Sequence, residues 1–179
     1  MRFITTAALA LFTALTLVAA DVPRPAKPLK LKTLEGSEIT LEQLRGKVVA
    51  VMFFSTDCPH CQQTAQLLAP MYTEMKPRGL EILGLAVNPS ASGNLKEFQQ
   101  KFGANFPLGL TTRSDWSAFG EFSVMHNPYV PYMLIVDRNG VIREEHPGQD
   151  RKFWLEQENN LRQSFDTLLK EPAKKSPSS

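Results

Sequence analysis

Apolar and polar positions follow two kinds of pattern along this chain, and their order predicts a mixed α/β fold. Continuous apolar runs, which are typical of strands buried on both faces, occupy residues 48–52, 80–87 and 132–137. Apolar residues spaced three and four apart, as on one face of a helix, occupy residues 62–76 and 150–170. The first strand, helix and second strand therefore form a unit that needs a right-handed parallel crossover.

Shorter patterns predict further elements. Asn-Gly at residues 139–140 is a strong signal for a tight hairpin turn, and Thr40 and Asn94 are residue types that cap helices well. In chain order, we expect a hairpin over residues 29–40, a short helix over 41–44, a helix over 94–102, a strand over 106–110, a helix over 115–122 and a returning strand over 141–145. The whole order predicts an α/β fold with a central mixed β-sheet, helices on both faces, and the hairpin as an N-terminal extension.

The start of the chain predicts a secretory signal peptide over residues 1–20. Arg2 precedes the apolar, uncharged residues 3–18, and the small residues Ala19-Ala20 fit a peptidase cut before Asp21. An exported protein, periplasmic or secreted, with no stable membrane insertion follows if the signal is cleaved. An uncleaved membrane anchor is the alternative, although the apolar run is short for a membrane span.

The composition predicts one globular domain. The 179 residues are 42% hydrophobic and 21% charged, which suffices for a single core. Residues 29–170 are the expected domain, preceded by a Pro-rich linker over residues 21–28 and followed by a disordered tail over residues 171–179. The net charge of +2 gives no indication of nucleic-acid binding.

Cys58 and Cys61, the only cysteines, stand where the first apolar strand gives way to a helix that begins near Pro59. This spacing places both sulfurs on one side of the first helical turn and predicts a redox-active dithiol. Unpaired N–H groups and the helix dipole should stabilise the Cys58 thiolate, which is the nucleophile, while Cys61 resolves the mixed disulfide. Pro59 suits the first helical position, and His60 can stabilise the thiolate by charge or by a hydrogen bond.

Two other uses of the cysteine pair are a structural disulfide and a zinc site. A structural disulfide would close a very short loop, which constrains the unfolded chain little. A zinc site would need four ligands, and His60, His126 and His146 show no metal-like spacing, so no metal is expected. In an oxidising compartment a dithiol either delivers oxidising equivalents or is kept reduced by an electron donor.

A family resemblance rests on three stretches: residues 34–49, the Cys58-Pro59-His60-Cys61 motif, and Val130-Pro131 with residues 133–140 after it. They resemble the thioredoxin-like superfamily, and most of all its exported TlpA-like branch, which groups with the peroxiredoxin and redoxin families. The resemblance covers about residues 29–169. It implies a thioredoxin-like fold and an exported thiol–disulfide oxidoreductase that acts on protein thiols and disulfides and on a redox partner. It implies no cofactor beyond the redox-active Cys58–Cys61 disulfide.

The resemblance also implies a substrate-binding role for the Val130-Pro131 step. In that family the proline before the third core strand is cis and packs beside the dithiol. Carried to this chain, Pro131 is the cis-proline, and the backbone of Val130 pairs with a bound substrate strand next to Cys58. Pro128 lies farther from the strand and is a weaker candidate, and Tyr129 is expected near the rim of the site.

Three positions depart from the family pattern. Thioredoxins carry Trp immediately before the first cysteine and a buried Asp six residues before it, where this chain has Asp57 and Met52. Many TlpA-like reductases carry Glu three residues after the second cysteine, where this chain has Thr64. The family's usual carboxylate base is therefore missing from both positions. Either Asp57 or water accepts the proton in its place, or the site is not tuned as a reductase. Asp57 would oppose the Cys58 thiolate by like charge, or it would cap the helix.

The Pro59-His60 pair adds a second resemblance, to the periplasmic disulfide-oxidising branch of the superfamily. There the pair stabilises the reduced thiolate and makes the disulfide a strong oxidant. The scaffold and the dipeptide thus favour different directions of electron transfer, and the sequence leaves the direction open.

Two other functions stay open at this point. A peroxiredoxin-like thiol peroxidase would need a Pro-x-x-x-Thr-x-x-Cys arrangement, but Thr56 is two residues before Cys58 and no proline stands in the required place. A non-enzymatic thiol-based metal carrier would use the same two sulfurs. Two tryptophans are expected in packing roles and two histidines in surface loops: Trp116, Trp154, His126 and His146.

Overall fold

The computed structural model describes residues 22–123, 125 and 128–173. The predicted signal peptide and His126 lie outside these residues. Within the described ranges, no helix is both long enough and apolar enough to cross a bilayer.

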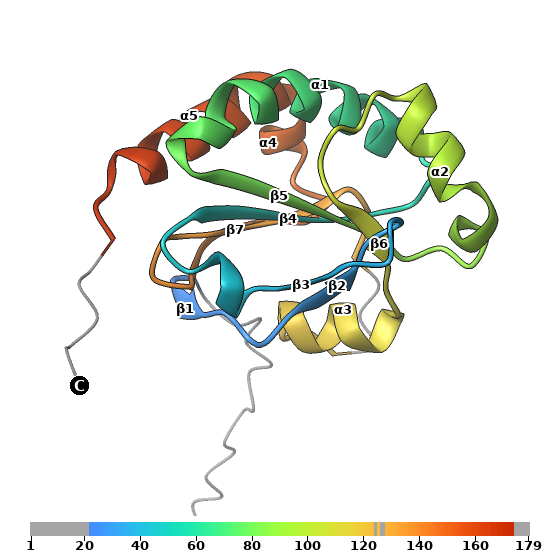
Figure 1. Ribbon diagram of the computed structural model, residues 1–179, viewed down its shortest axis with the longest axis horizontal. Coiled ribbons are helices and arrows are strands. Elements are labelled where there is room, and N and C mark those ends of the chain that lie inside the picture. Colours follow the sequence, from blue (N-terminus) through green and yellow to red (C-terminus); the bar gives the residue numbers. More distant parts are fainter. Residues whose placement is uncertain (1–21, 124, 126–127, 174–179) are drawn as a thin grey trace, which may run out of the picture.

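A six-stranded sheet lies at the centre, in the order β1-β8-β7-β4-β5-β6 (Figure 1). Its middle strand, β4 (Val48–Phe54), pairs in parallel with β5 (Leu80–Ala86) and antiparallel with β7 (Tyr132–Val136). On the outer sides, β5 pairs in parallel with β6 (Leu108–Leu110), and β7 pairs antiparallel with β8 (Val141–His146). The structure confirms the predicted mixed sheet, in which β4, β5 and β7 coincide with the three apolar runs.

Helices cover both faces of the sheet, as predicted (Figure 1). One layer contains α1 (Pro59–Met75), α2 (Ala91–Lys101), α4 (Arg151–Leu155) and α5 (Gln157–Lys170). The other contains α3 (Arg113–Gly120) and the predicted hairpin, β2 (Lys30–Lys32) and β3 (Glu38–Thr40), followed by the short 3-10 helix η1 (Glu42–Leu44). A second 3-10 helix, η2 (Lys76–Arg78), follows α1.

The central strand explains why the core divides into two clusters. Every residue of β4 is buried, and successive side chains of a strand point to opposite faces of the sheet. Ala50 and Met52 therefore pack in the cluster under α1 and α5, while Val51 and Phe53 pack in the cluster with α3 and the hairpin. Trp116 of α3 is buried there and stacks on Phe53 with 5.5 Å between ring centroids, so its predicted packing role is confirmed.

The helix predicted over residues 150–170 is wrong as a single element, because α4 and α5 are separated at Glu156. The backbone of Glu156 has φ −115° and ψ 38°, outside the helical region. The side-chain amide of Asn160 donates to the carbonyl oxygen of Phe153 at 2.8 Å, and such side-chain bonds compete with the helical ladder. The break leaves Leu155 79% exposed.

Two predicted helix starts are also wrong by two or three residues. Helix α2 begins at Ala91, before Asn94, and no side-chain cap is present at its first turn. Helix α3 begins at Arg113, because the hydroxyl of Thr112 accepts a hydrogen bond from the N–H of Asp115 at 3.1 Å and caps the helix. The short helix η1 begins at Glu42, so Leu41 and not Thr40 occupies its N-cap position, without a side-chain cap. The Thr40 hydroxyl still accepts from the N–H of Gln43 at 3.4 Å.

Part of the segment predicted to be a linker belongs to the sheet. Arg24 and Pro25 form β1, an edge strand paired antiparallel with β8. The Arg24 side chain is buried and forms ion pairs with Glu121 at 3.0 Å and Glu145 at 2.6 Å. Lys27, three residues on, is exposed and pairs with Glu121 at 3.2 Å. These contacts tie the N-terminal segment to the domain.

Candidate active site

The dithiol stands at the junction of β4 and α1. The chain leaves β4 at Phe54 and turns so that the N–H of Cys58 donates to the carbonyl oxygen of Ser55 at 3.2 Å. Cys58 then occupies the N-cap position of α1 with extended backbone angles, and Pro59 is the first helical residue. The predicted placement of Cys58 at a helix N-terminus is confirmed, and it exposes the sulfur to unpaired backbone N–H groups.

The two sulfurs differ in environment and in acidity. Cys58 is half-buried, its Sγ accepts from the N–H of Cys61 at 3.4 Å, and hydrogen bonding from the Cys61 side chain lowers the pKa of Cys58 to about 6. The backbone N–H groups of Cys61 and His60 and the charge of His60 act in the same direction, against the opposing effect of burial. Cys61 is fully buried, and burial raises the pKa of its thiol. Cys58 therefore forms a thiolate readily, whereas Cys61 remains a buried thiol.

The Val130-Pro131 step lies directly beside Cys58. The peptide bond between Val130 and Pro131 is cis, as predicted. The Sγ of Cys58 is 3.8 Å from the carbonyl oxygen of Val130, so the dithiol and this backbone group come together from parts of the chain far apart in sequence. A hollow of about 650 Å³ adjoins the Val130-Pro131 step, and its lining also includes His60, Trp154 and Leu155.

Thr56 and Asn88 hold the loop before Cys58, a contact that the sequence analysis missed. The side-chain oxygen of Asn88 accepts from the N–H of Thr56 at 3.1 Å, and its amide donates to the Thr56 hydroxyl at 2.8 Å. Asn88 follows the end of β5, and the ends of neighbouring parallel strands lie at the same edge of a sheet. That rule was the signal that could have placed Asn88 near the dithiol.

Asp57 does not cap α1, so that interpretation is wrong. The carboxylate of Asp57 accepts a hydrogen bond from the hydroxyl of Ser55, while the sulfur of Cys58 takes the capping position. The reason is geometric, since Asp57 lies one residue too early to reach the free N–H groups of the first turn. Asp57 is exposed beside the dithiol, where its negative charge raises the pKa of Cys61 as one of several smaller contributions after burial.

Thr64, which stands where many family members carry Glu, lies in a neutral buried environment. Its hydroxyl lies 2.9 Å from the carbonyl oxygen of His60 and donates to the side-chain oxygen of Gln157 at 2.8 Å. Both side chains are buried. The pair links the second turn of α1 to the first residue of α5 without adding a charge behind the dithiol.

His146 does not lie in a surface loop, so this prediction is wrong. It is the last residue of β8, and its side chain is only 17% exposed. Its ring lies between the carboxylates of Glu144 and Asp150 and stacks on Phe153 at 3.5 Å between centroids. Trp154 packs nearby as predicted, and its indole N–H donates to the carbonyl oxygen of Pro147 at 2.8 Å.

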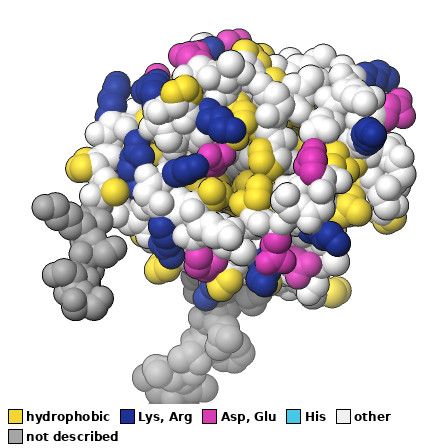
Figure 2. All heavy atoms as spheres, viewed as in Figure 1, with side chains coloured by type: hydrophobic (Ala, Val, Ile, Leu, Met, Phe, Trp, Pro, Cys, Tyr) yellow, Lys and Arg dark blue, Asp and Glu magenta, His cyan; other side chains and the backbone are white. Residues whose placement is uncertain are grey.

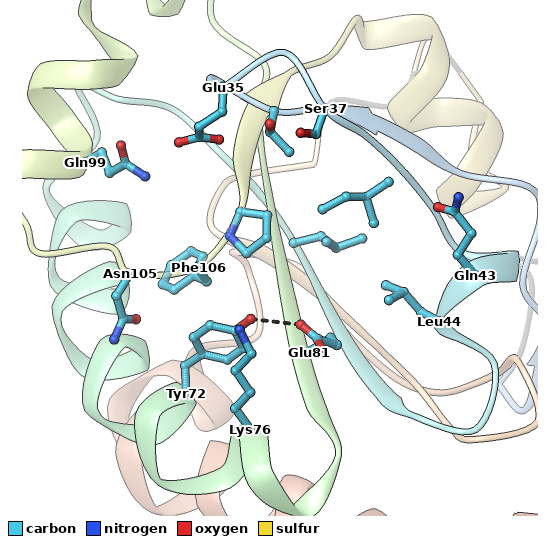
Figure 3. Close-up of a pocket in the computed structure, with 14 residues that line it drawn as sticks. Glu35, Ser37, Gln43, Leu44, Tyr72, Lys76, Glu81, Gln99, Asn105 and Phe106 are labelled. Carbon is cyan, nitrogen blue, oxygen red and sulfur yellow. Dashed lines mark hydrogen bonds between the residues drawn. The ribbon is translucent and has the colours of Figure 1, made fainter.

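A second hollow, of about 590 Å³, lies at the opposite end of the strands. Apolar side chains gather there between α1 and the hairpin (Figure 2), and the lining includes Leu44 and Phe106 (Figure 3). Its one deeply placed carboxylate, Glu81, is already bound by Tyr72 at 2.8 Å and Lys47 at 2.6 Å. Glu81 precedes the end of β5 by five residues, roughly 17 Å at the usual rise per residue. This hollow is therefore separate from the dithiol.

In the part of the chain that the structure describes, no three His, Cys, Asp or Glu side chains are grouped so that they could hold a metal ion.

The AhpC/TSA family matches residues 22–145. This chain belongs to the AhpC/TSA family. The thiol-disulfide oxidoreductase ResA of Bacillus anthracis is 28% identical over 123 residues, which span 69% of this chain and 68% of that protein. The chloroplastic peroxiredoxin Q of Suaeda salsa is 31% identical over 118 residues, but these span only 53% of that protein.

Solved structures of thiol:disulfide interchange proteins share the fold of this chain. A thiol:disulfide interchange protein of the thioredoxin family from Chlorobium tepidum superposes with a TM-score of 0.68 at 22% identity, covering 84% of this chain and 99% of that chain. A thiol:disulfide interchange protein from a Bacteroides species gives a TM-score of 0.67 at 19% identity, over 88% of this chain and 95% of that one. The fold is thus thioredoxin-like, as predicted, and this AhpC/TSA family member is an oxidoreductase of the thioredoxin superfamily.

Proposed function

We propose that this protein is an exported thiol–disulfide oxidoreductase that exchanges disulfides with protein substrates through Cys58 and Cys61. The observation that carries the proposal is the contrast between the two sulfurs. Cys58 is accessible at a helix N-terminus with a pKa lowered to about 6, mainly by hydrogen bonding from Cys61, and Cys61 is buried one turn further on. Such a pair suits two successive attacks, by Cys58 on the substrate disulfide and then by Cys61 on the mixed disulfide.

The chemistry balances within the dithiol and the substrate. The Cys58 thiolate attacks a substrate disulfide, so that a mixed disulfide forms and one substrate sulfur leaves as a thiolate. Cys61 then loses its proton to solvent or to Asp57 and attacks the Cys58 sulfur, which releases the second substrate thiolate. The substrate gains two electrons and the protein is left with a Cys58–Cys61 disulfide. The reverse sequence oxidises a substrate dithiol, and a redox partner restores the starting state without any other cofactor.

The residues around the sulfurs take supporting roles in this proposal. Val130, whose carbonyl oxygen lies 3.8 Å from the Cys58 sulfur, would pair with an extended substrate segment, and Pro131 would fix the backbone at that point. His60 would stabilise the thiolate by charge, consistent with its effect on the Cys58 pKa after the larger effect of hydrogen bonding from Cys61. Pro59 would start the helix. The negative charge of Asp57 would oppose the thiolate form of the sulfurs.

Export is supported by the sequence of the first 20 residues, which has the order of a signal peptide. An exported dithiol works in a periplasmic or extracellular setting, where disulfides form and persist. The substrates in that setting would be proteins with thiols or disulfides.

A thiol peroxidase is less well supported by the geometry. The hydroxyl of Thr56 is bound by Asn88 at 2.8 Å, and Thr56 stands two residues before Cys58. Thr56 therefore holds the loop, and the Pro-x-x-x-Thr-x-x-Cys arrangement of a peroxiredoxin is not present at Cys58.

The two cysteines can be tested separately. Cys58→Ser should abolish disulfide exchange, because it removes the accessible thiolate. Cys61→Ser should leave the first attack intact and accumulate mixed disulfides between Cys58 and substrate proteins, because the resolving thiol is missing. The measurement is non-reducing electrophoresis and mass spectrometry of adducts formed with a disulfide-bonded peptide. Stable adducts on Cys61 of the Cys58→Ser variant would reverse the assigned roles.

A further inference from the structure

The loop between β8 and α4, residues 147–150, is bonded to the chain just before Val130. The N–H of Gly148 donates to the carbonyl oxygen of Tyr129 at 2.9 Å. The N–H of Tyr129 donates to the side-chain oxygen of Gln149 at 3.0 Å. Both main-chain polar groups of Tyr129 are therefore bound by this one loop, while the Tyr129 side chain stays 64% exposed.

Gly148 makes this contact a direct one between backbones. A Cβ atom placed on Gly148 would lie 2.7 Å from both the carbonyl carbon and the carbonyl oxygen of Tyr129. Such distances are well inside ordinary van der Waals contact. Any larger residue at Gly148 must therefore push Tyr129 away, and the neighbouring Val130 carbonyl is the group beside the Cys58 sulfur.

The loop is itself held in place from the α4 side. The carbonyl oxygen of Pro147 accepts from the N–H of Asp150 and from the indole N–H of Trp154, each at 2.8 Å. The carboxylate of Asp150 accepts from the N–H of Phe153 at 3.2 Å and so caps α4.

His146 connects this loop to the rest of the domain. Its Nδ1 lies 3.0 Å from the Asp150 carboxylate, and its Nε2 lies 3.1 Å from the Glu144 carboxylate. Glu144 also accepts from the hydroxyl of Ser164 on α5 at 2.6 Å. Hydrogen bonds thus run from α5 through His146 and the 147–150 loop to Tyr129.

We propose that His146, Gly148 and Gln149 are positioning residues, which hold Tyr129 so that the Val130 carbonyl faces an incoming polypeptide beside Cys58. This inference rests on the proposed function of the dithiol and adds which residues govern its use of polypeptide substrates. The contacts reach the main chain next to the sulfur and not the sulfur itself. They therefore affect recognition of a substrate that has a peptide main chain, and leave the acidity of Cys58 as it is.

The test compares two disulfides that differ in having a main chain. Pre-reduced protein is mixed with an excess of a disulfide-bonded peptide, or of the small aromatic disulfide 5,5′-dithiobis(2-nitrobenzoate). The rate of this single turnover is followed against disulfide concentration, with the half-saturating concentration taken as KM and the limiting rate as kcat. For Gln149→Ala, which removes one exposed hydrogen bond, the KM for the peptide should rise about three- to tenfold, the scale of one lost bond. The kcat with peptide should change much less, because the lost contact binds the ground state and the transition state equally. The rate with the aromatic disulfide and the pH profile of Cys58 alkylation should match the wild type.

Three further variants and one control complete the test. Gly148→Ala and His146→Ala should raise the peptide KM at least as much, and His146→Gln, which keeps one amide donor, should recover part of the loss. Thr167→Ala is the control, since Thr167 lines the hollow near His146 and its hydroxyl donates to the carbonyl oxygen of Gln163 within α5, and it should behave as the wild type.

Three results decide the matter. Unchanged peptide KM in Gln149→Ala and Gly148→Ala would overturn the positioning role. A parallel loss with the aromatic disulfide would also overturn it, because the dithiol itself would then be disturbed. A wild-type protein that reacts with neither disulfide would instead contradict the proposed function, so the two failures are distinguishable.

Discussion

At the scale of single residues, the dithiol shows how neighbouring positions on one helical turn acquire opposite acidities. Cys58 caps α1 and receives hydrogen bonds from the side chain and N–H of Cys61, which lower its pKa to about 6. Cys61 is enclosed by the core, and burial raises its pKa. The difference stabilises the reduced form with a single thiolate, which makes the corresponding disulfide more oxidising.

His60 supplies a testable part of that stabilisation. His60→Pro removes an imidazole and one backbone N–H donor near Cys58, both of which lower the Cys58 pKa after the larger effect of Cys61. The Cys58 pKa should rise, and each unit of rise should lower the reduction potential by roughly 30 mV. The pH dependence of Cys58 alkylation and equilibration with glutathione measure the two effects.

Asp57→Ala is the matched variant on the other side of Cys58. Removing a neighbouring negative charge should lower the Cys58 pKa, opposite to His60→Pro. If neither the alkylation profile nor the potential responds to His60→Pro, the Pro59-His60 pair does not tune the site. The TlpA-like scaffold would then be the better guide, and it favours a reductase.

At the scale of elements, the N-terminal edge strand depends on one buried cation. Arg24 of β1 is 8% exposed at its side chain and pairs with Glu121 and Glu145, and Glu145 also accepts from the Tyr132 hydroxyl. Arg24 therefore joins β1, the end of α3 and β8. Without it, two carboxylates would remain in a partly buried place with less compensating charge.

Arg24→Ala should lower the free energy of unfolding by about 3–5 kcal/mol, the usual cost of removing one partner from a buried ion pair. Lys27→Ala is the control. Lys27 pairs with the same Glu121 at 3.2 Å, but its side chain is 56% exposed, so the loss should be about 0–1 kcal/mol. Urea denaturation of both variants gives the comparison. Equal losses would show that burial of Arg24 does not set the strength of the contact.

At the scale of the whole molecule, the acidity of Cys58 couples stability to pH. Hydrogen bonding from Cys61 holds the Cys58 pKa near 6 in the folded chain, against about 8.5 when unfolded. Between these values the unfolded chain holds a proton that the folded chain has lost, so stability rises with pH. The contribution is complete above pH 8.5 and is lost as the pH falls through 6.

The reduced protein should therefore gain stability from pH 6 to pH 8.5 relative to Cys58→Ser. Groups common to both proteins cancel in the difference, and Cys61 stays protonated in the folded state over this range because burial raises its pKa. Urea denaturation with a phosphine reductant at the two pH values gives the measurement. A difference that does not grow with pH would contradict the lowered pKa of Cys58.

The strands, the dithiol and most of the fold could be predicted because their signals are contiguous in the chain. The apolar runs mark β4, β5 and β7, and the Cys-x-x-Cys spacing places both sulfurs on the first turn of α1. Burial on both faces requires unbroken apolar side chains, and hydrogen bonding within one helical turn depends on spacing alone. These features need no knowledge of what packs against them.

Only the tertiary structure decided which distant groups surround the sulfurs. Asn88 reaches Thr56 across 32 residues, and Gln149 reaches Tyr129 across 20. The break between α4 and α5, the partly buried place of His146 and the pairing of Arg24 in β1 likewise arise from contacts between separate elements. A polar side chain gives the same local pattern whether it faces water or a partner elsewhere in the chain, so its partner is determined only when the elements pack.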